Sequence, residues 1–325
     1  MPAINVSHLV KEYRFSVRNP EKGVVANFFS PDQKTVRAVN DISFTVERGE
    51  SVVFIGPNGA GKSTTIKMLT GILHPTSGDI SVLGLSPQRE RKKLAMHIGS
   101  VFGQRSQLVH NLPLTDSFDL LAAVYDVPQG EYSARSKKLI ASFDLYSFLD
   151  QPVRKLSLGQ RMRAEVAASL LHNPDILFLD EPTIGLDVVA KRALRETLND
   201  VHRELGTTIF LTSHDAGDIE SVTDRTIVVN NGVIAFDGTT TDLSKSFLKK
   251  KIIRVIHDGE SLAVTLPDTV TIIKNENGEL SIELDTTRTP VSTILPTLMN
   301  TAIVDISIED PPLEEVISEL YRHAS

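Results

Sequence analysis

Residues 56–63 read Gly56-Pro57-Asn58-Gly59-Ala60-Gly61-Lys62-Ser63, and Thr64 follows them. The stretch matches the pattern G-x-x-x-x-G-K-[ST], which forms a phosphate-binding loop where it joins a strand to a helix. The apolar run 51–55 supplies the strand, and Ile66 and Leu69 lie at helical spacing after the loop. A chance match in a chain of this size is about a 1% event at average residue usage. The sequence therefore predicts a nucleotide-binding protein.

The chemistry of phosphate binding explains the residue types in this loop. Glycines let backbone N–H groups turn towards one point, and the following helix aims its positive end at the same point. Lys62 brings a charge for the outer phosphates, and Ser63 offers a hydroxyl to a magnesium ion. We expect residues 56–64 to bind the nucleotide and Lys62 to act in catalysis as well.

Composition restricts the class of protein. The 325 residues carry a net charge of −7, which disfavours a general nucleic-acid binder. The chain has no cysteine, which excludes disulfides and thiolate metal sites. The sequence shows neither a signal peptide nor an apolar stretch of about 18 residues that could span a membrane. We expect a soluble cytosolic protein, for which any membrane role requires another subunit.

Strand and helix patterns alternate between residues 51 and 240, which predicts an α/β domain with a mainly parallel sheet. Residues 4–13 predict an edge strand that ends at Tyr13, and 16–35 predict an insert with a short helix at 24–29. Residues 113–155 predict a helical insert. Short strands at 252–256, 262–266, 270–273 and 280–284 predict a small α+β domain at the C-terminus. We expect domain boundaries at 1–243 and 244–325.

Polar side chains follow two buried strands of the predicted sheet. Asp180 and Glu181 follow the apolar run 176–179, and His214 follows 208–213. Ligands bind at the carboxyl ends of such strands. We therefore expect Asp180 to hold magnesium, Glu181 to polarise an attacking water, and His214 to bond the γ-phosphate. Taken alone, Asp180 and Glu181 also fit a pair of surface acids at a strand end, and His214 also fits a structural histidine.

A second candidate phosphate site begins a helix at Ser157-Leu158-Gly159-Gln160. The exposed N–H groups of a helix start attract anions. An ordinary helix cap explains Ser157 but leaves Gly159 and Gln160 unexplained. Two phosphate sites in one chain imply a dimer in which one copy's helix start faces the nucleotide on the other copy.

These motifs together resemble the nucleotide-binding subunits of ATP-binding cassette (ABC) transporters over about residues 4–240. The resemblance covers the family's motifs in the family's order: Walker A at 56–63, the Q-loop at Gln104 with Gln107 as the alternative, the signature at 156–160, Walker B at 176–180 with Glu181, the D-loop at 184–187 and the switch His214. The signature departs from the family pattern at Leu158, where glycine is usual. The family's fold adds an antiparallel β subdomain and a helical insert to the parallel sheet.

The resemblance implies ATP and Mg²⁺ as cofactors. Tyr13 matches the aromatic residue that stacks on adenine, although a core tyrosine at a strand end is the alternative. Ser63, Gln104 and Asp180 would hold magnesium. Ser157, Gly159 and Gln160 would contact the partner copy's nucleotide.

Residues 156–163, 180–187 and 311–316 resemble the corresponding segments of ABC-2-type exporters, which implies ATP hydrolysis coupled to export of a drug-like, lipid or polysaccharide substrate. An integral membrane permease and a second ATPase copy or a related ATPase subunit would be the partners, on the cytoplasmic face of the membrane. Residues 16–35 fit either a gate-type helix near the membrane or a helix packed on its own domain. The rival functions are a soluble ABC ATPase that acts on nucleic acid or ribosomes and a nucleotide-regulated binding module.

Overall fold

The computed structural model describes residues 1–17, 32–103, 106–222, 225–247, 250–262, 264, 266–299, 303–309, 317 and 321. The chain divides into two compact units, of which the first comprises Met1–Gly238 with Ala324–Ser325 and the second Thr239–His323. Each unit is described by itself.

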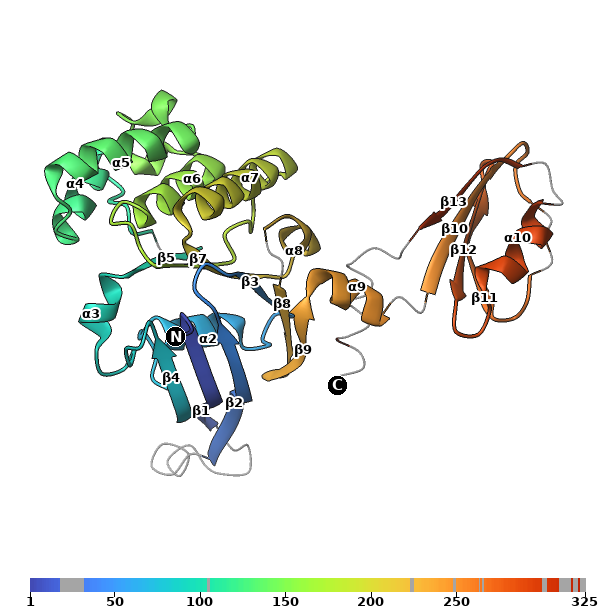
Figure 1. The fold of residues 1–325 in the computed structure, drawn as a ribbon, viewed down its shortest axis with the longest axis horizontal. Coiled ribbons are helices and arrows are strands. Elements are labelled where there is room, and N and C mark those ends of the chain that lie inside the picture. Colours follow the sequence, from blue (N-terminus) through green and yellow to red (C-terminus); the bar gives the residue numbers. More distant parts are fainter. Residues whose placement is uncertain are drawn as a thin grey trace. The chain divides into compact units, whose positions relative to one another are not determined.

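A six-stranded sheet in the order β5-β6-β7-β3-β8-β9 forms the centre of the first unit (Figure 1). Its strands are β3 (Ser51–Ile55), β5 (Ile98–Phe102), β6 (Ile176–Asp180), β7 (Thr208–Ser213), β8 (Arg225–Asn230) and β9 (Val233–Thr239). The pairs β5–β6, β6–β7, β7–β3 and β3–β8 are parallel, as the apolar runs predict. Because parallel strands end at the same edge, the segments that follow β3, β6 and β7 meet there.

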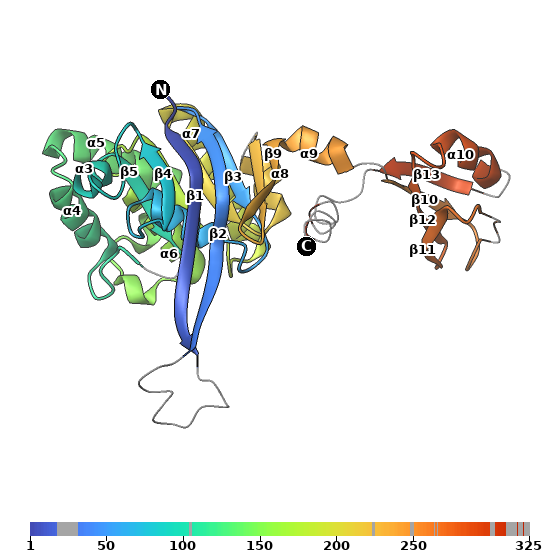
Figure 2. The same cartoon turned by 90° about the horizontal axis from the view of Figure 1, so that it is seen from below.

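A three-stranded antiparallel sheet in the order β2-β1-β4 forms a second layer. Its strands are β1 (Ile4–Val17), β2 (Asp32–Val46) and β4 (Ser77–Val82). The predicted edge strand is wrong in two respects, because β1 is the central strand and continues past Tyr13. The extension forms because residues 32–36 of β2 pair with 13–17, and the two strands make a long arm (Figure 2). The predicted helix at 24–29 lies outside the described residues.

Helices cover both faces of the parallel sheet. They are α2 (Lys62–Leu69), α3 (Arg91–Ala95), α6 (Leu158–Ser169), α7 (Val188–Leu205) and α8 (Ala216–Val222). Helix α2 contacts strands of both sheets, and α6 and α8 lie over the opposite face of the parallel sheet (Figure 1). Phe44, Phe54 and Phe210 pack ring against ring between the layers, with centroids 5.5–6.0 Å apart. This core fixes the strands whose ends carry the predicted site.

The segment 113–155 is helical and projects from the sheet domain as a separate group (Figure 1). It comprises α4 (Leu114–Val124), α5 (Gln129–Ser142) and two short 3₁₀ turns, Tyr146–Phe148 and Val153–Lys155. A bridge between Pro113 and Pro152 closes its base.

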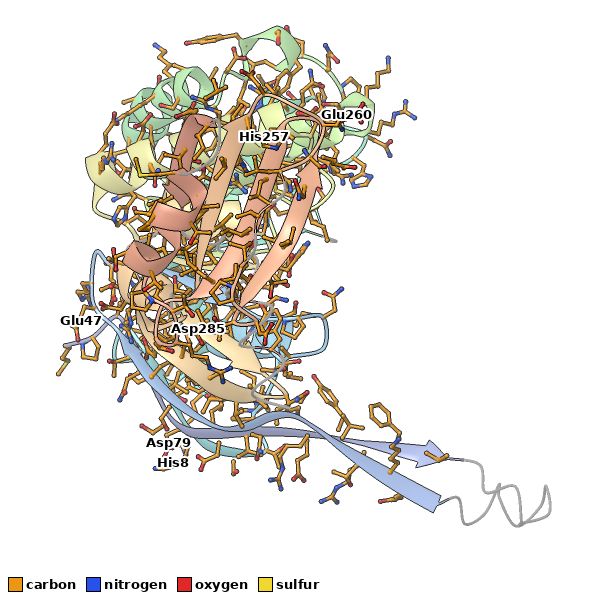
Figure 3. All side chains as sticks on the ribbon, turned by 90° about the vertical axis from the view of Figure 1, so that its right-hand side faces the viewer. His8, Glu47, Asp79, His257, Glu260 and Asp285 are labelled. Atoms are coloured by element: carbon orange, nitrogen blue, oxygen red, sulfur yellow. The ribbon has the colours of Figure 1, made fainter. Side chains whose placement is uncertain are left out.

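The second unit contains an antiparallel sheet in the order β11-β12-β10-β13. Its elements are α9 (Thr240–Phe247), β10 (Lys250–His257), β11 (Val270–Glu276), β12 (Glu279–Asp285), α10 (Val291–Met299) and β13 (Ile303–Glu309). His257 and Asp285 mark opposite ends of this sheet (Figure 3). The predicted strand at 262–266 is wrong, because its described residues lie outside any strand and Leu262 bonds the Asn275 side chain at 2.8 and 3.0 Å.

The described helices are all too short or too polar to cross a membrane.

Candidate active site

The phosphate loop connects β3 to α2 as a tight turn. Gly61 has a φ of 103° and stands at the N-terminus of α2, and a Cβ there would lie 2.4 Å from the carbonyl oxygen of Ala38. Both facts restrict this position to glycine. Gly59 also has a positive φ, 87°, but an added Cβ would meet nothing within 4 Å. The loop therefore needs glycine at 61 for space and conformation, and at 59 for conformation alone.

Lys62 is buried, with 5% of its surface exposed, and its ammonium group lies inside the loop. Its Nζ donates to the Gly56 carbonyl at 2.6 Å and lies 3.1 Å from Oε1 of Glu181. A buried ammonium without partners would be costly, so these contacts fix its position. The residue thus joins the phosphate loop to the acid at the end of β6.

Asp180 receives two hydroxyl hydrogen bonds at one carboxylate oxygen. Ser63 Oγ donates to Oδ1 at 3.0 Å, and Thr212 Oγ1 donates to the same atom at 2.6 Å. Thr212 is the neighbour of Asp180 across the β6–β7 pair. The predicted meeting of Ser63 with Asp180 is therefore present in the structure.

Glu181 leaves β6 in the left-handed region, with a φ of 54°, which is an unusual conformation for a residue other than glycine. Its backbone N–H bonds Thr212, both to the carbonyl and to the hydroxyl at 3.1 Å. Its side chain bonds Lys62 through one oxygen and Nδ1 of His214 through the other. The structure therefore brings Lys62, Glu181 and His214 into one chain of contacts.

A cavity of about 260 Å³ lies over the loop, lined by Ala38, Pro57, Asn58, Gly59, Gly61, Lys62, Ser63, Thr64 and Glu181. Seven of these nine residues belong to the predicted loop. The described part of the chain has no cluster of three or more His, Cys, Asp or Glu side chains that could hold a metal by themselves. Ser63 and Asp180 nevertheless fit Mg²⁺, because this ion takes hard oxygen donors and is bound beside phosphates through only one or two carboxylates.

The start of α6 carries the second predicted site. Ser157 caps the helix by accepting a hydrogen bond from the Gln160 backbone N–H at 3.2 Å, and the Gln160 side chain accepts one from the Ser157 backbone N–H at 2.9 Å. This capping box explains Gln160 as well as Ser157 without a ligand. Close packing explains the glycine at position 159, since a Cβ there would lie 3.3 Å from the Cβ of Ala190 in α7. A groove of about 400 Å³ separates the starts of α6 and α7.

Two predicted nucleotide contacts stay predictions. Tyr13 lies in β1, stacked on Phe15 at 6.3 Å, and is not among the residues that line the phosphate cavity. Its partner in β2, Val36, stands two residues before Ala38, which does line it. Gln104 lies outside the described residues. The alternative Gln107 bonds the backbone carbonyl of Glu165 through its side chain at 2.9 Å.

Comparison with known proteins identifies the family. The model of the ABC transporter family matches residues 39–184. The chain is 31% identical over 218 residues to the ABC transporter ATP-binding protein NatA of Bacillus subtilis (strain 168), which covers 67% of this chain and 88% of that protein. This chain belongs to the ATP-binding proteins of ABC transporters. The family assignment confirms the predicted resemblance and the predicted ATPase activity.

A second relative extends the similarity. The daunorubicin resistance ATP-binding protein DrrA3 of Streptomyces coeruleorubidus is 30% identical over 291 residues, covering 87% of this chain and 91% of that protein. This alignment is longer than the first unit, so it includes part of the second.

A solved structure of the ATP-binding subunit of an ABC transporter superposes with a TM-score of 0.62 at 28% identity, covering 75% of this chain and 93% of that one. The ABC ATPase fold predicted from the sequence is confirmed. ABC ATPases bind ATP, dimerise and pair with membrane subunits.

Two residues of the site were not predicted. Thr212 bonds both acids at the end of β6, and Ala38 closes the cavity from β2. The position of Thr212, two residues before a candidate histidine, was only a weak signal, because hydroxyl residues are common at strand ends. Ala38 carried none, because its place depends on how β2 packs on the loop.

Proposed function

We propose that this ABC ATPase powers an ABC-2-type exporter in which a separate integral membrane permease carries the substrate. The similarity to ATP-binding proteins of ABC transporters supports the exporter role, and the observation that carries the ATPase role is the contact chain of Lys62, Glu181 and His214 beside the phosphate cavity. It supplies a cation for the phosphates, a carboxylate for water and a second polar group next to that carboxylate. A module that binds the nucleotide without hydrolysing it needs neither the carboxylate for water nor the polar group next to it.

In this proposal hydrolysis proceeds by attack of water on the γ-phosphorus. Glu181 orients the water and accepts its proton as the new P–O bond forms, while the bond to the β,γ-bridging oxygen breaks and ADP departs. Lys62 and the loop N–H groups stabilise the charge on the phosphate oxygens. His214 bonds a γ-phosphate oxygen and holds the Glu181 carboxylate by the contact described above.

Mg²⁺ would be held by Ser63 and Asp180, with Gln104 as the third residue. The ion supplies charge neutralisation for the phosphates when it is bound. Thr212 supports this arrangement because its hydroxyl holds the same carboxylate oxygen that Ser63 contacts. Tyr13 would stack on the adenine, and the remaining loop residues, 56–61 and 64, would bind the phosphates.

Two copies are required for a complete site in this proposal. Ser157, Gly159 and Gln160 of one copy would contact the nucleotide held by the phosphate loop of the other. The exposed apolar residues next to the groove support such pairing, since Val188 and Val189 at the start of α7 are 82% and 79% exposed. The second subunit is another copy of this chain or a related ATPase.

The transported substrate is proposed from the relatives. One of the relatives described above is named for daunorubicin resistance. We infer a drug-like or lipid substrate, with a polysaccharide as the further possibility within the same exporter class. The helical segment 113–155 would transmit closure of the dimer to the permease on the cytoplasmic face of the membrane.

The test is to isolate the chain with its partner. Tagged protein carrying Glu181→Gln, which is expected to hold ATP, is captured from detergent-solubilised membranes of its native cells, with Lys62→Ala as the nucleotide-deficient control. We expect a polytopic membrane protein to co-purify and the wild-type complex to release phosphate. Recovery with ribosomes or nucleic acid in place of a membrane protein would overturn the exporter assignment.

A further inference from the structure

Asp218 is a fully buried acid close to the site but outside every motif identified in the sequence. It lies in α8, four residues after His214, with 0% of its surface exposed. A buried carboxylate is costly unless hydrogen bonds and a counter-charge compensate for lost hydration. Its partners therefore show what the residue holds together.

Each carboxylate oxygen of Asp218 has a separate set of donors. The hydroxyls of Thr183 and Ser213 both donate to Oδ2, the first at 2.7 Å. Nε of Arg195, in α7, donates to Oδ1 at 2.6 Å. Helix α7 packs on α8 (Figure 1). One acid thus receives hydrogen bonds from three segments.

The two hydroxyl donors flank the proposed catalytic residues. Thr183 stands two residues after Glu181, and Ser213 stands directly before His214. We propose that Asp218 is a positioning residue that holds Glu181 and His214 in register by binding both of their flanking segments through one oxygen. The inference rests on the proposed roles of those two residues.

A second acid extends the network to the other side of His214. Asp215 accepts hydrogen bonds from Arg195 at 3.0 Å and from Lys191, and from the Gly217 backbone N–H at 2.9 Å. Burial alone would raise the pKa of Asp215, but the hydrogen bond from Lys191 and the charges of Arg195 and Lys191 lower it below its usual range. Arg195 therefore bonds both acids, and α7 anchors the segment that carries His214.

An isosteric amide replaces this carboxylate only in part, because it carries no charge opposite Arg195 and its N–H would require the two hydroxyls to accept instead of donate. Asparagine has one acceptor oxygen and one donor nitrogen, whereas Asp218 offers acceptors on both sides. In Asp218→Asn either the two hydroxyls or the Arg195 Nε–H would face an amide N–H. We expect the segments that carry Glu181 and His214 to lose their common anchor.

A residue that only stabilises the fold would behave differently. Loss of the buried pair Arg195–Asp218 would then lower stability and ATP affinity together. A positioning residue instead lowers kcat at unchanged ATP affinity, because the phosphate loop does not contact Asp218. The split between kcat and affinity separates the two roles.

The experiment uses Asp218→Asn, Thr183→Val and Ser213→Ala in the full chain. Asp242→Asn is the matched control, since Asp242 also accepts a threonine hydroxyl, from Thr239 at 2.7 Å, but in the second unit. Phosphate release gives kcat, and fluorescent-nucleotide titration gives ATP affinity. We expect a fall in kcat of about tenfold or more for Asp218→Asn, on the scale of a lost charged hydrogen bond, with affinity within about twofold.

Coupling between the variants completes the test. If Thr183 acts through Asp218, Thr183→Val lowers kcat in the wild-type chain and has little further effect in Asp218→Asn. Unchanged kcat in both Thr183→Val and Ser213→Ala would overturn the inference, even if Asp218→Asn does not fold. Glu181→Gln is measured in the same assay. Normal turnover by Glu181→Gln would refute the proposed function itself. Loss of turnover in Glu181→Gln together with normal turnover in Asp218→Asn would refute only the positioning role.

Discussion

The two predicted phosphate sites of this chain are built in different ways. At the phosphate loop, the bonds from Ser63 to Asp180 and from Lys62 to Glu181 join residues far apart in sequence, and they add to a local bond from Lys62 to the Gly56 carbonyl. At the start of α6, the bonds join Ser157 to Gln160, three residues apart. The first site is held by the sheet, and the second is held by its own helix turn.

This difference bears on what each site can do alone. The long-range bonds join a cation, two acids and a histidine within a single copy, and Lys62 and Glu181 line the phosphate cavity. The helix start presents a satisfied cap and an open groove, with no charged side chain bonded into the cap. Only the first therefore gathers charged side chains beside a cavity, and the proposed role of the second requires a nucleotide held by another copy.

The largest expected effect comes from Glu181→Gln. The amide cannot accept a proton from water, so turnover should fall about 10³-fold, while ATP still binds because the phosphate loop is intact. Phosphate release and nucleotide titration measure the two quantities. Glu204→Gln, which alters an exposed glutamate paired with Lys138, should leave both unchanged. Wild-type turnover by Glu181→Gln would show that the loop site works by another mechanism.

Lys62→Ala should have the next largest effect, on ATP affinity. The change removes a buried cation from the phosphate cavity and leaves Glu181 without its ion-pair partner. We expect affinity to fall about 10- to 100-fold, the scale of charged hydrogen bonds. Calorimetry measures it, with Lys67→Ala, an exposed lysine of the same helix, as the control. Equal affinity in the two variants would contradict the proposed role of the loop.

The long-range contacts also show how far the sequence could predict the site. The meeting of Ser63 with Asp180 followed from parallel strands that end at one edge. The roles of Thr212 and Asp218 did not follow, because strand-end hydroxyls and helix-surface acids are common. Their identity depends on the β6–β7 register and on the packing of α7 against α8.

The fold, like the site, was predictable only where the signal is local in the sequence. The apolar runs predicted the parallel sheet, since strands buried on both faces carry a strong local signal. The position of β1 in the middle of the antiparallel sheet was not predictable, because it depends on pairing with β4 about 75 residues later. The domain boundaries and the site roles stay predictions.

His172, three residues after the end of α6, offers a third prediction, on stability. His172 stacks on Tyr125 with centroids 3.9 Å apart and bonds the Ile98 carbonyl at 3.1 Å. Burial lowers the pKa of His172 to about 4. The unfolded chain therefore binds the proton first, so the free energy of unfolding should fall by about 2 kcal/mol as pH drops from 6.5 to 4.

Denaturant titration across that pH range measures the effect. His172→Phe can keep the ring stack but cannot titrate, so its pH dependence should be weaker by the same amount. An identical pH dependence in both proteins would assign the acid sensitivity to other groups. The prediction sharpens the comparison because His172, which follows α6, has long-range contacts, whereas the start of α6 is held by local bonds.

The smallest effects are expected at that start. Ser157→Ala removes the cap and should lower the free energy of unfolding by about 1 kcal/mol, with turnover reduced about tenfold through the lost contact to the partner's nucleotide. Ser157→Asp keeps a good cap but brings a negative charge to a phosphate site, so stability should be retained while turnover falls further. Equal turnover in Ser157→Asp and wild type would mean that this helix start never meets a phosphate, and the site would then be complete in one copy.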